Sequence, residues 1–253
     1  MKIIDLTQLI TADMPVYPGT EQPKLAVANT VEKDGFRETL ITFYSHTGTH
    51  MDAPFHIYAD RTSLDALPAE QFVGKALVID CTDVAEGGTI GMEHIDKAMA
   101  DQAEFLIFRT GWDKYWGQEK YFGEYPVVSM EVCQYLLDSQ KKGVGFDVIG
   151  IDPVSDGNLT RHKMLLSQRD IVIIENLTNL GEIGGGNPLG FEITRKRSCV
   201  GSPGEDQVAL LHRPVRSLAV SLPEFILEYL PLVLHILCKL QALCGVIGIL
   251  AAT

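Results

Sequence analysis

The sequence predicts a single α/β domain, because short apolar runs alternate with helical patterns along its first 190 residues. Four runs, each bounded by glycine or a polar residue, have the length of buried strands. These runs are residues 76–80, 105–108, 148–152 and 171–175. No segment rich in proline, glycine or serine divides this part of the chain, so a second domain is not expected there.

The other elements are predicted from local signals. Residues 3–10 alternate weakly and favour a strand, whereas residues 13–19 contain two prolines and a glycine and indicate a loop. Residues 38–44 form a β-rich run. Helices are predicted at residues 92–100 and 129–140, and the second opens with a serine of the kind that caps helices.

Glycine-rich stretches at two places lack a nucleotide-binding pattern. Gly143 and Gly145 have no third glycine at dinucleotide-binding spacing, and residues 184–186 follow no strand-to-helix pattern. Both stretches are predicted to be turns.

The composition is that of a globular protein with an acidic surface. The chain is 46% hydrophobic and 21% charged, and its formal net charge is -12. An acidic surface repels phosphate backbones, which argues against nucleic acid as a partner. Five scattered cysteines argue against a disulfide framework and a thiolate zinc site. The first residues reach an acid too early for a signal peptide, so a cytoplasmic location is expected.

The end of the chain is strongly apolar and unlike the rest. Residues 229–250 have the length of a membrane span, but a proline, a histidine, Lys239 and a glutamine interrupt them. A central lysine is expensive in hydrocarbon, so a membrane location is not favoured.

Three interpretations of this end remain open. It is a helix buried in an oligomer interface, a membrane-associated tail, or a segment not shaped by the selection that shaped the domain. A reading-frame change near residue 190 would produce the third. We therefore divide the chain into a domain of residues 1–220 and an atypical tail of residues 221–253.

Three of the seven histidines fall within eleven residues. His46, His50 and His56, with Asp52 among them, share parity, so an extended strand would point them to one face, although Pro54 must bend the path. Imidazoles and a carboxylate suit zinc or another divalent first-row metal. A bound metal lowers the pKa of its water to roughly 7. A nearby histidine that is not a ligand, for which His56 is placed, could move protons to the leaving group.

The string from His46 to His56 resembles the H-x-G-T-H-x-D-x-P-x-H signature of the cyclase family, which includes bacterial kynurenine formamidases and isatin hydrolases. Residues 15–19, 109–112 and 150–152 fit the same resemblance. It covers roughly the first 190 residues. The resemblance implies a swivelling β/β/α fold and a homodimer or higher homo-oligomer.

The resemblance also implies the site residues. Asp52 would bridge a first and a second metal, and His56 would be the proton donor and acceptor. Tyr17 matches an aromatic residue that lines the substrate pocket in formamidases, where tryptophan is usual. The implied metal ligands are His46, His50, Asp52, His162 and Glu175.

Some of these residues have alternative interpretations when each is taken alone. Glu175 ends an apolar strand, where a carboxylate is costly to bury unless it is paired or metal-bound, but a strand-end residue can also reach solvent. His162 alone would be a surface loop residue. Asp152 and Asp156 are loop residues that could support the ligands.

The predicted function is metal-dependent hydrolysis of an amide or formamide bond in a small molecule, with zinc or manganese, one or two ions per chain. Hydrolysis of a cyclic amide or lactone is an alternative. A non-catalytic metal- or ligand-binding protein on the same scaffold is another. Structural zinc sites are usually closed and rich in cysteine, so the cysteine-free motif with a spare histidine favours catalysis.

Overall fold

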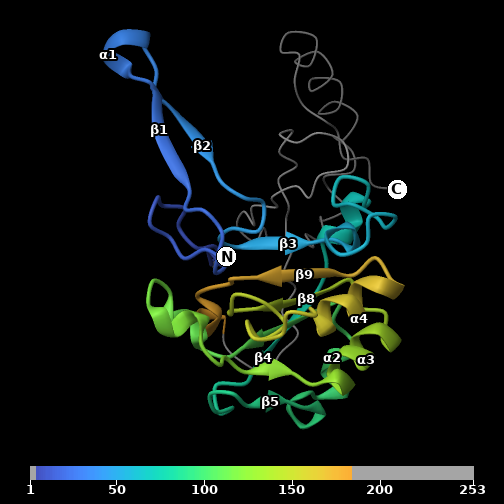
Figure 1. Cartoon of the computed structure of the whole chain (residues 1–253). Coiled ribbons are helices and arrows are strands. Elements are labelled where there is room, and N and C mark those ends of the chain that lie inside the picture. Colours follow the sequence, from blue (N-terminus) through green and yellow to red (C-terminus); the bar gives the residue numbers. More distant parts are fainter. Residues whose placement is uncertain (1–3, 184–253) are drawn as a thin grey trace, which may run out of the picture. The chain divides into compact units, whose positions relative to one another are not determined.

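The structure is a computed structural model, and it describes residues 4–183 of the 253-residue chain. This part has a mixed α/β fold around a five-stranded sheet of order β3-β9-β8-β6-β4 (Figure 1). The strands β4, β6, β8 and β9 run parallel, and β3 is antiparallel to β9. Their bounds are β3 (His50–Asp52), β4 (Ala76–Asp80), β6 (Phe105–Arg109), β8 (Gly143–Phe146) and β9 (Val172–Glu175).

Three of the four predicted sheet strands are confirmed within a residue or two, as β4, β6 and β9. The predicted strand at 148–152 is wrong, because these residues form bends beyond the end of β8. The prediction of a turn at Gly143 and Gly145 is also wrong, because both lie in β8. A Cβ atom on Gly145 would lie 2.7 Å from Ile107 Cδ1, so glycine here permits close packing.

The predicted helix at 129–140 is confirmed as α3 (Met130–Asp138), with the Ser129 side chain accepting a hydrogen bond from the Val132 amide. The predicted helix at 92–100 is interrupted. Asp96 caps a new short helix there, because its carboxylate accepts hydrogen bonds from the amides of Ala98 and Met99. The helical elements here are η3 (Met92–His94) and α2 (Lys97–Ala100), and α4 (Thr160–Gln168) precedes β9.

The remaining elements are short. The predicted strand at 3–10 is wrong for the described residues 4–10, which are irregular, whereas 13–19 form the expected loop. Residues 4–10 are held by isolated hydrogen bonds, such as that from the Thr178 amide to the Leu6 carbonyl. The other short elements are η1 (Pro54–His56), η2 (Ala69–Phe72), β5 (Thr89–Ile90), η4 (Trp112–Tyr115), η5 (Glu119–Phe122), β7 (Val127–Val128) and η6 (Leu180–Glu182).

The five-stranded sheet is covered on both faces, as its nearly continuous apolar strands require. Side chains of β6 alternate between two buried clusters. Phe108 packs in the cluster that contains Leu136 of α3 and Leu165 of α4, whereas Phe105 belongs to the cluster with Phe72. The sheet is therefore a rigid base for the side chains at its β3–β9 edge.

A separate two-stranded antiparallel sheet precedes the histidine motif. It consists of β1 (Lys24–Asn29) and β2 (Glu38–Thr42), connected through the short helix α1 (Val31–Asp34). The strand β2 confirms the β-rich run predicted at 38–44. Figure 1 shows this hairpin, in blue, leading away from the five-stranded sheet.

None of the helices within residues 4–183 is long and apolar enough to cross a membrane. The predicted apolar tail of residues 221–253 and the glycines at 184–186 lie outside the described residues. The predicted domain boundary at residue 220 lies there too, and it stays a prediction.

The close packing around β8 gives a stability prediction. Replacing Gly145 with alanine should lower the free energy of unfolding by about 2 kcal/mol, because the new methyl group would meet Ile107 Cδ1 at 2.7 Å and Leu177 Cδ1 at 2.9 Å. Urea unfolding measures the effect. Gly157→Ala is the matched control, since a Cβ atom there meets nothing within 4 Å. Equal stability of the two variants would contradict this explanation of the glycine.

Candidate metal site

The pairing of β3 with β9 brings the first candidate ligands together. His50 lies opposite Glu175 in this antiparallel pair, and Asp52 lies two residues further along β3. Directly opposite residues share a face of the sheet, as do residues two apart on one strand. The side chains of His50, Asp52 and Glu175 therefore project from the same face, and the parity predicted from the sequence holds for this part of the motif.

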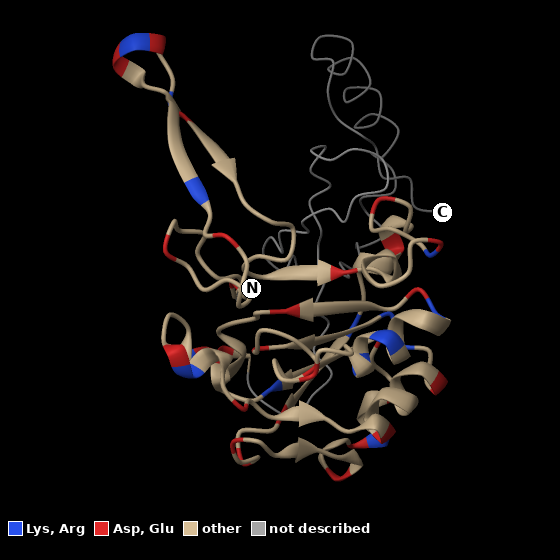
Figure 2. Cartoon of the chain, in the orientation of Figure 1, with Lys and Arg blue, Asp and Glu red and all other residues tan. Residues whose placement is uncertain are grey.

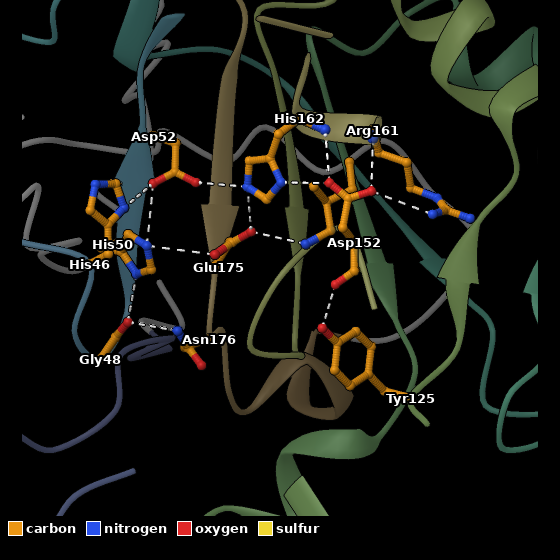
Figure 3. Close-up of polar contacts among 11 residues, drawn as sticks. His46, Gly48, His50, Asp52, Tyr125, Asp152, Arg161, His162, Glu175 and Asn176 are labelled. Atoms are coloured by element: carbon orange, nitrogen blue, oxygen red, sulfur yellow. Dashed lines mark hydrogen bonds and ion pairs between the residues drawn. The ribbon is translucent and has the colours of Figure 1, made fainter. Parts of the chain in front are cut away.

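The remaining candidate ligands reach the same place from neighbouring segments (Figure 3). Nδ1 of His46 lies 2.7 Å from Asp52 Oδ1, and Nε2 of His50 lies 3.3 Å from the same oxygen. Nε2 of His162 lies 3.4 Å from Asp52 Oδ2 and 3.3 Å from Glu175 Oε1. The other oxygen of Glu175 lies 3.6 Å from His50 Nε2. Each carboxylate thus faces His50 with one oxygen and His162 with the other.

These groups are buried, which makes their charges important. Asp52 is completely buried, and His50, His162 and Glu175 are at most 5% exposed. Burial alone would raise the pKa of Asp52, but the neighbouring histidines hold that pKa well below its usual range. Burial alone would lower the pKa of His162, but Asp152, Asp52 and Glu175 raise it well above its usual range. The cluster therefore favours positive charge beside its two carboxylates.

The residues present fit a divalent ion. Nε2 of His50 and both side-chain oxygens of Asp52 are buried without a regular hydrogen bond, a costly arrangement unless another partner satisfies them. Ligand atoms of His50, Asp52 and Glu175 lie within 4.8 Å of one another, and so do those of His46, Asp52 and His56. Imidazole nitrogens with carboxylate oxygens suit zinc or manganese.

Two hydrogen bonds orient the buried imidazoles. Nδ1 of His50 lies 2.9 Å from the carbonyl oxygen of Gly48, and Nδ1 of His162 lies 2.8 Å from Asp152 Oδ2. If Nδ1 carries the proton in each ring, Nε2 is left as the metal-facing atom, as is usual for histidine ligands. Asp152 thus supports a candidate ligand, His162, as the sequence analysis considered. Asp156 does not, because its carboxylate accepts hydrogen bonds from nearby amides at the start of α4.

Asn176 is a supporting residue that the sequence reasoning missed. Its side chain donates a hydrogen bond to the Gly48 carbonyl at 2.9 Å and accepts one from the Tyr121 hydroxyl at 2.8 Å, while its carbonyl accepts one from Thr49 Oγ1. Its φ of 58° lies in the left-handed region that asparagine tolerates well. An asparagine directly after the strand-end Glu175 was the available signal.

Taken alone, His162 was interpreted as a surface loop residue and Glu175 as a strand-end residue that can reach solvent, and both interpretations are wrong. His162 lies in the first turn of α4 and is buried, because its ring packs towards the carboxylates. Glu175 is also buried and does not reach solvent; its Oε1 accepts a hydrogen bond from the Ile151 amide. His56, in η1, stacks on His46 with a distance of 3.9 Å between ring centroids. The structure thus brings His56 to the edge of the cluster.

Tyr17 lines a cavity of about 400 Å³, whose wall consists mainly of residues 13–20 and 117–119. A cavity of this size can hold a small molecule. The loop of residues 13–20 also contacts the histidine motif of residues 46–56, because Met14 Cε lies 2.8 Å from the place that a Cβ atom of Gly48 would occupy. The predicted pocket aromatic is therefore in a wall beside the histidine motif.

A mixed α/β fold with histidines and carboxylates gathered at one sheet edge defines a candidate metal centre. The chain belongs to the cyclase family, because the family model described as putative cyclase matches residues 4–153. A kynurenine formamidase from Bacillus cytotoxicus is 30% identical over 175 residues, which cover 69% of this chain and 81% of that protein. The family resemblance seen in the motif is thus confirmed.

Solved structures give the same picture of the fold. A potential metal-dependent hydrolase with cyclase activity is 30% identical, with a TM-score of 0.57 over 73% of this chain and 86% of that one. An isatin hydrolase bound to the product analogue thioisatinate is 21% identical, with a TM-score of 0.70 over 85% of this chain and 92% of that one. The second likeness concerns the fold alone.

The Asn176 side chain gives a testable prediction. Asn176→Ala should weaken zinc binding by about 10- to 100-fold, because the Gly48 carbonyl that orients His50 loses its hydrogen-bond donor. Competition with a chromophoric chelator measures the affinity, and thermal unfolding verifies that the variant is folded.

Two further variants separate the effect of losing the Asn176 side-chain amide from the effect of changing the backbone conformation at that position. Asn179→Ala is the matched control, since Asn179 is exposed and has nearly the same φ, 57°. Asn176→Gly keeps the left-handed backbone accessible but removes the amide, so it should weaken binding as alanine does. Wild-type affinity in Asn176→Gly would show that only the backbone conformation matters.

Proposed function

We propose that this chain hydrolyses an amide or formamide bond of a small molecule and uses a zinc or manganese ion, one or two per chain. The proposal rests on the shared position of Asp52 and Glu175 between His50 and His162. A divalent ion bound there polarises a carbonyl oxygen and makes water more acidic. The proposed metal ligands are His46, His50, Asp52, His162 and Glu175.

The chain itself supplies fixed geometry. Gly48 and Asp152 hold the two buried imidazoles through Nδ1, so their Nε2 atoms do not need to reorient when a substrate enters. The Asp152 carboxylate is held in turn by the amides of Arg161 and His162. Preorganised groups of this kind stabilise developing charge without a reorganisation cost at the moment of reaction.

His56 is the proposed proton donor and acceptor. It lies beside His46 at the edge of the cluster and is only half-buried, so its ring is partly accessible from outside the cluster. In the proposed reaction, water adds to the carbonyl carbon while His56 accepts its proton. The carbon–nitrogen bond then breaks, and His56 returns the proton to the departing nitrogen. The products are a carboxylic acid and an amine.

The cavity at Tyr17 supports a small-molecule substrate with an aromatic ring. Its charged lining residues are Asp13 and Glu119, both acidic, so a substrate with an amino group would meet complementary charge. The relative in Bacillus cytotoxicus is named a kynurenine formamidase. An aromatic formamide with an amino group is therefore the first substrate to test.

A set of histidine variants tests the roles. With N-formylkynurenine as substrate, His56→Ala should lower kcat by at least about 100-fold and leave the metal content unchanged, because a lost general acid–base group costs this much. His50→Ala should lose both metal and activity. His94→Ala is the control, since His94 lies outside the cluster and contacts Asp83 and Glu93. Loss of metal from His56→Ala would make His56 a ligand and refute its proposed role.

The choice of substrates separates the competing functions. Turnover of isatin without turnover of N-formylkynurenine would replace the formamide with a cyclic amide. Turnover of lactones alone would reject carbon–nitrogen cleavage. A protein that binds metal but turns over no amide, ester or lactone would contradict hydrolysis and indicate a metal-binding protein without catalysis.

A further inference from the structure

Tyr121 is a fully buried tyrosine that the proposed reaction does not use. It lies in η5 between Glu119 and Phe122, and both of these neighbours line the cavity at Tyr17. Its hydroxyl donates a hydrogen bond at 2.8 Å to Oδ1 of Asn176. Burial raises the pKa of Tyr121 well above its usual range, so the hydroxyl keeps its proton and remains a donor.

We propose that Tyr121 is a positioning residue for the metal ligand His50 and acts through the Asn176 amide and the Gly48 carbonyl. The proposal rests on the proposed metal site, because His50 is a ligand only there. Three hydrogen bonds of 2.8, 2.9 and 2.9 Å connect these groups in the order Tyr121, Asn176, Gly48 and His50. We call this chain of hydrogen bonds the relay. Its effect is to keep the ring proton of His50 on Nδ1.

The His50 ring faces acceptors on two sides, so its proton has two places to go. Nδ1 faces the Gly48 carbonyl at 2.9 Å, whereas Nε2 lies 3.3 Å from Asp52 Oδ1 and 3.6 Å from Glu175 Oε2. The strands β3 and β9 carry no lysine or arginine, and each has one acidic residue, Asp52 or Glu175 (Figure 2). Two carboxylates favour a proton on Nε2, where it would block the nitrogen that a metal needs. A well-placed carbonyl at Nδ1 opposes this effect.

The Gly48 carbonyl needs a donor that fixes its direction. Gly48 has a φ of 69° and no Cβ atom, so its backbone is less restricted than that of other residues. Nδ2 of Asn176 donates a hydrogen bond to this carbonyl, and the carbonyl has a second lone pair for Nδ1 of His50. The carbonyl oxygen is therefore held between the amide and the imidazole.

Tyr121 fixes the Asn176 amide in turn. The terminal torsion of an asparagine side chain has a broad distribution, so its amide needs a partner on each side to hold one orientation. Nδ2 faces an acceptor, the Gly48 carbonyl, and Oδ1 faces a donor, the Tyr121 hydroxyl. Reversing the amide would place Oδ1 against the carbonyl oxygen, so that two acceptors would face each other. The direction of every hydrogen bond in the relay is therefore set from the hydroxyl to the imidazole.

The segment that forms one wall of the cavity also holds Tyr121. Nε1 of Trp112 donates a hydrogen bond to the Tyr121 carbonyl at 3.2 Å. The ring of Trp116 packs edge-on against the Tyr121 ring, with 5.0 Å between ring centroids. Residues 117–119 of the same segment line the cavity. One segment thus supplies both a wall of the proposed substrate cavity and the support of a metal ligand.

Zinc affinities of single and double variants test the proposal. Tyr121→Phe removes only the hydroxyl group, so it should weaken zinc binding by about 5- to 10-fold. The double variant Tyr121→Phe and Asn176→Ala should bind zinc as Asn176→Ala alone does, because the hydroxyl acts only through the amide. Tyr135→Phe is the matched control, since the Tyr135 hydroxyl donates a similar hydrogen bond, at 3.0 Å, to Asp101 outside the cluster. This control should keep the wild-type affinity.

The ring proton of His50 gives a second measurement, which is made on the wild type as well as on the variant. In the zinc-loaded protein, NMR should detect a proton on His50 Nδ1 that exchanges slowly with water. Its exchange should be faster in Tyr121→Phe, because the acceptor carbonyl is then held less firmly. Thermal unfolding verifies that each variant is folded.

Each contrary result has a distinct meaning. Wild-type zinc affinity in the folded Tyr121→Phe variant would overturn the proposal and leave the proposed hydrolase function intact. The same holds if the losses of the two single variants combine in full in the double variant, because the hydroxyl would then act by another route. A zinc-loaded wild type without a protected proton on His50 Nδ1 would also overturn it. A wild type that binds no divalent ion would overturn the metal site and this proposal together.

Discussion

Asp52 and Glu175 are two carboxylates buried next to each other, and the geometry of the site follows from the need to balance them. Isolated buried carboxylates are expensive, and a pair of them is more so. Three histidines surround the pair at 2.7–3.6 Å, and the pKa directions of Asp52 and His162 show that positive charge is favoured there. A divalent ion is the partner that the donor set fits best.

The arrangement of the sheet brings the histidines to these two carboxylates. The antiparallel strand β3 brings the histidine motif to β9, and the parallel strands behind β9 fix it in a covered core. Asn176 and Asp152 then connect this core to the imidazoles through hydrogen bonds. Precise placement of ligands thus depends on rigid strands and on supporting polar groups rather than on the motif alone.

Many of the site residues could be predicted from the sequence, since histidines and an aspartate rarely cluster at this spacing unless they share a function. The parity of His50 and Asp52 and the strand before Glu175 were visible as local patterns. The strand β8 was not predicted, because its glycines have no apolar side chain to signal a strand. The close packing that requires glycine at position 145 depends on Ile107 and Leu177, which belong to other segments. Asn176 was missed for a similar reason, because its partners Gly48 and Tyr121 are far away along the chain.

The most direct test of the metal centre is elemental analysis of the purified full-length protein, before and after treatment with a chelator and after zinc or manganese is added back. The account predicts one or two divalent ions per chain, removed by the chelator and restored by addition. A folded chain that binds neither ion when supplied with it would contradict the account, because the buried carboxylates would then be balanced by the histidines alone.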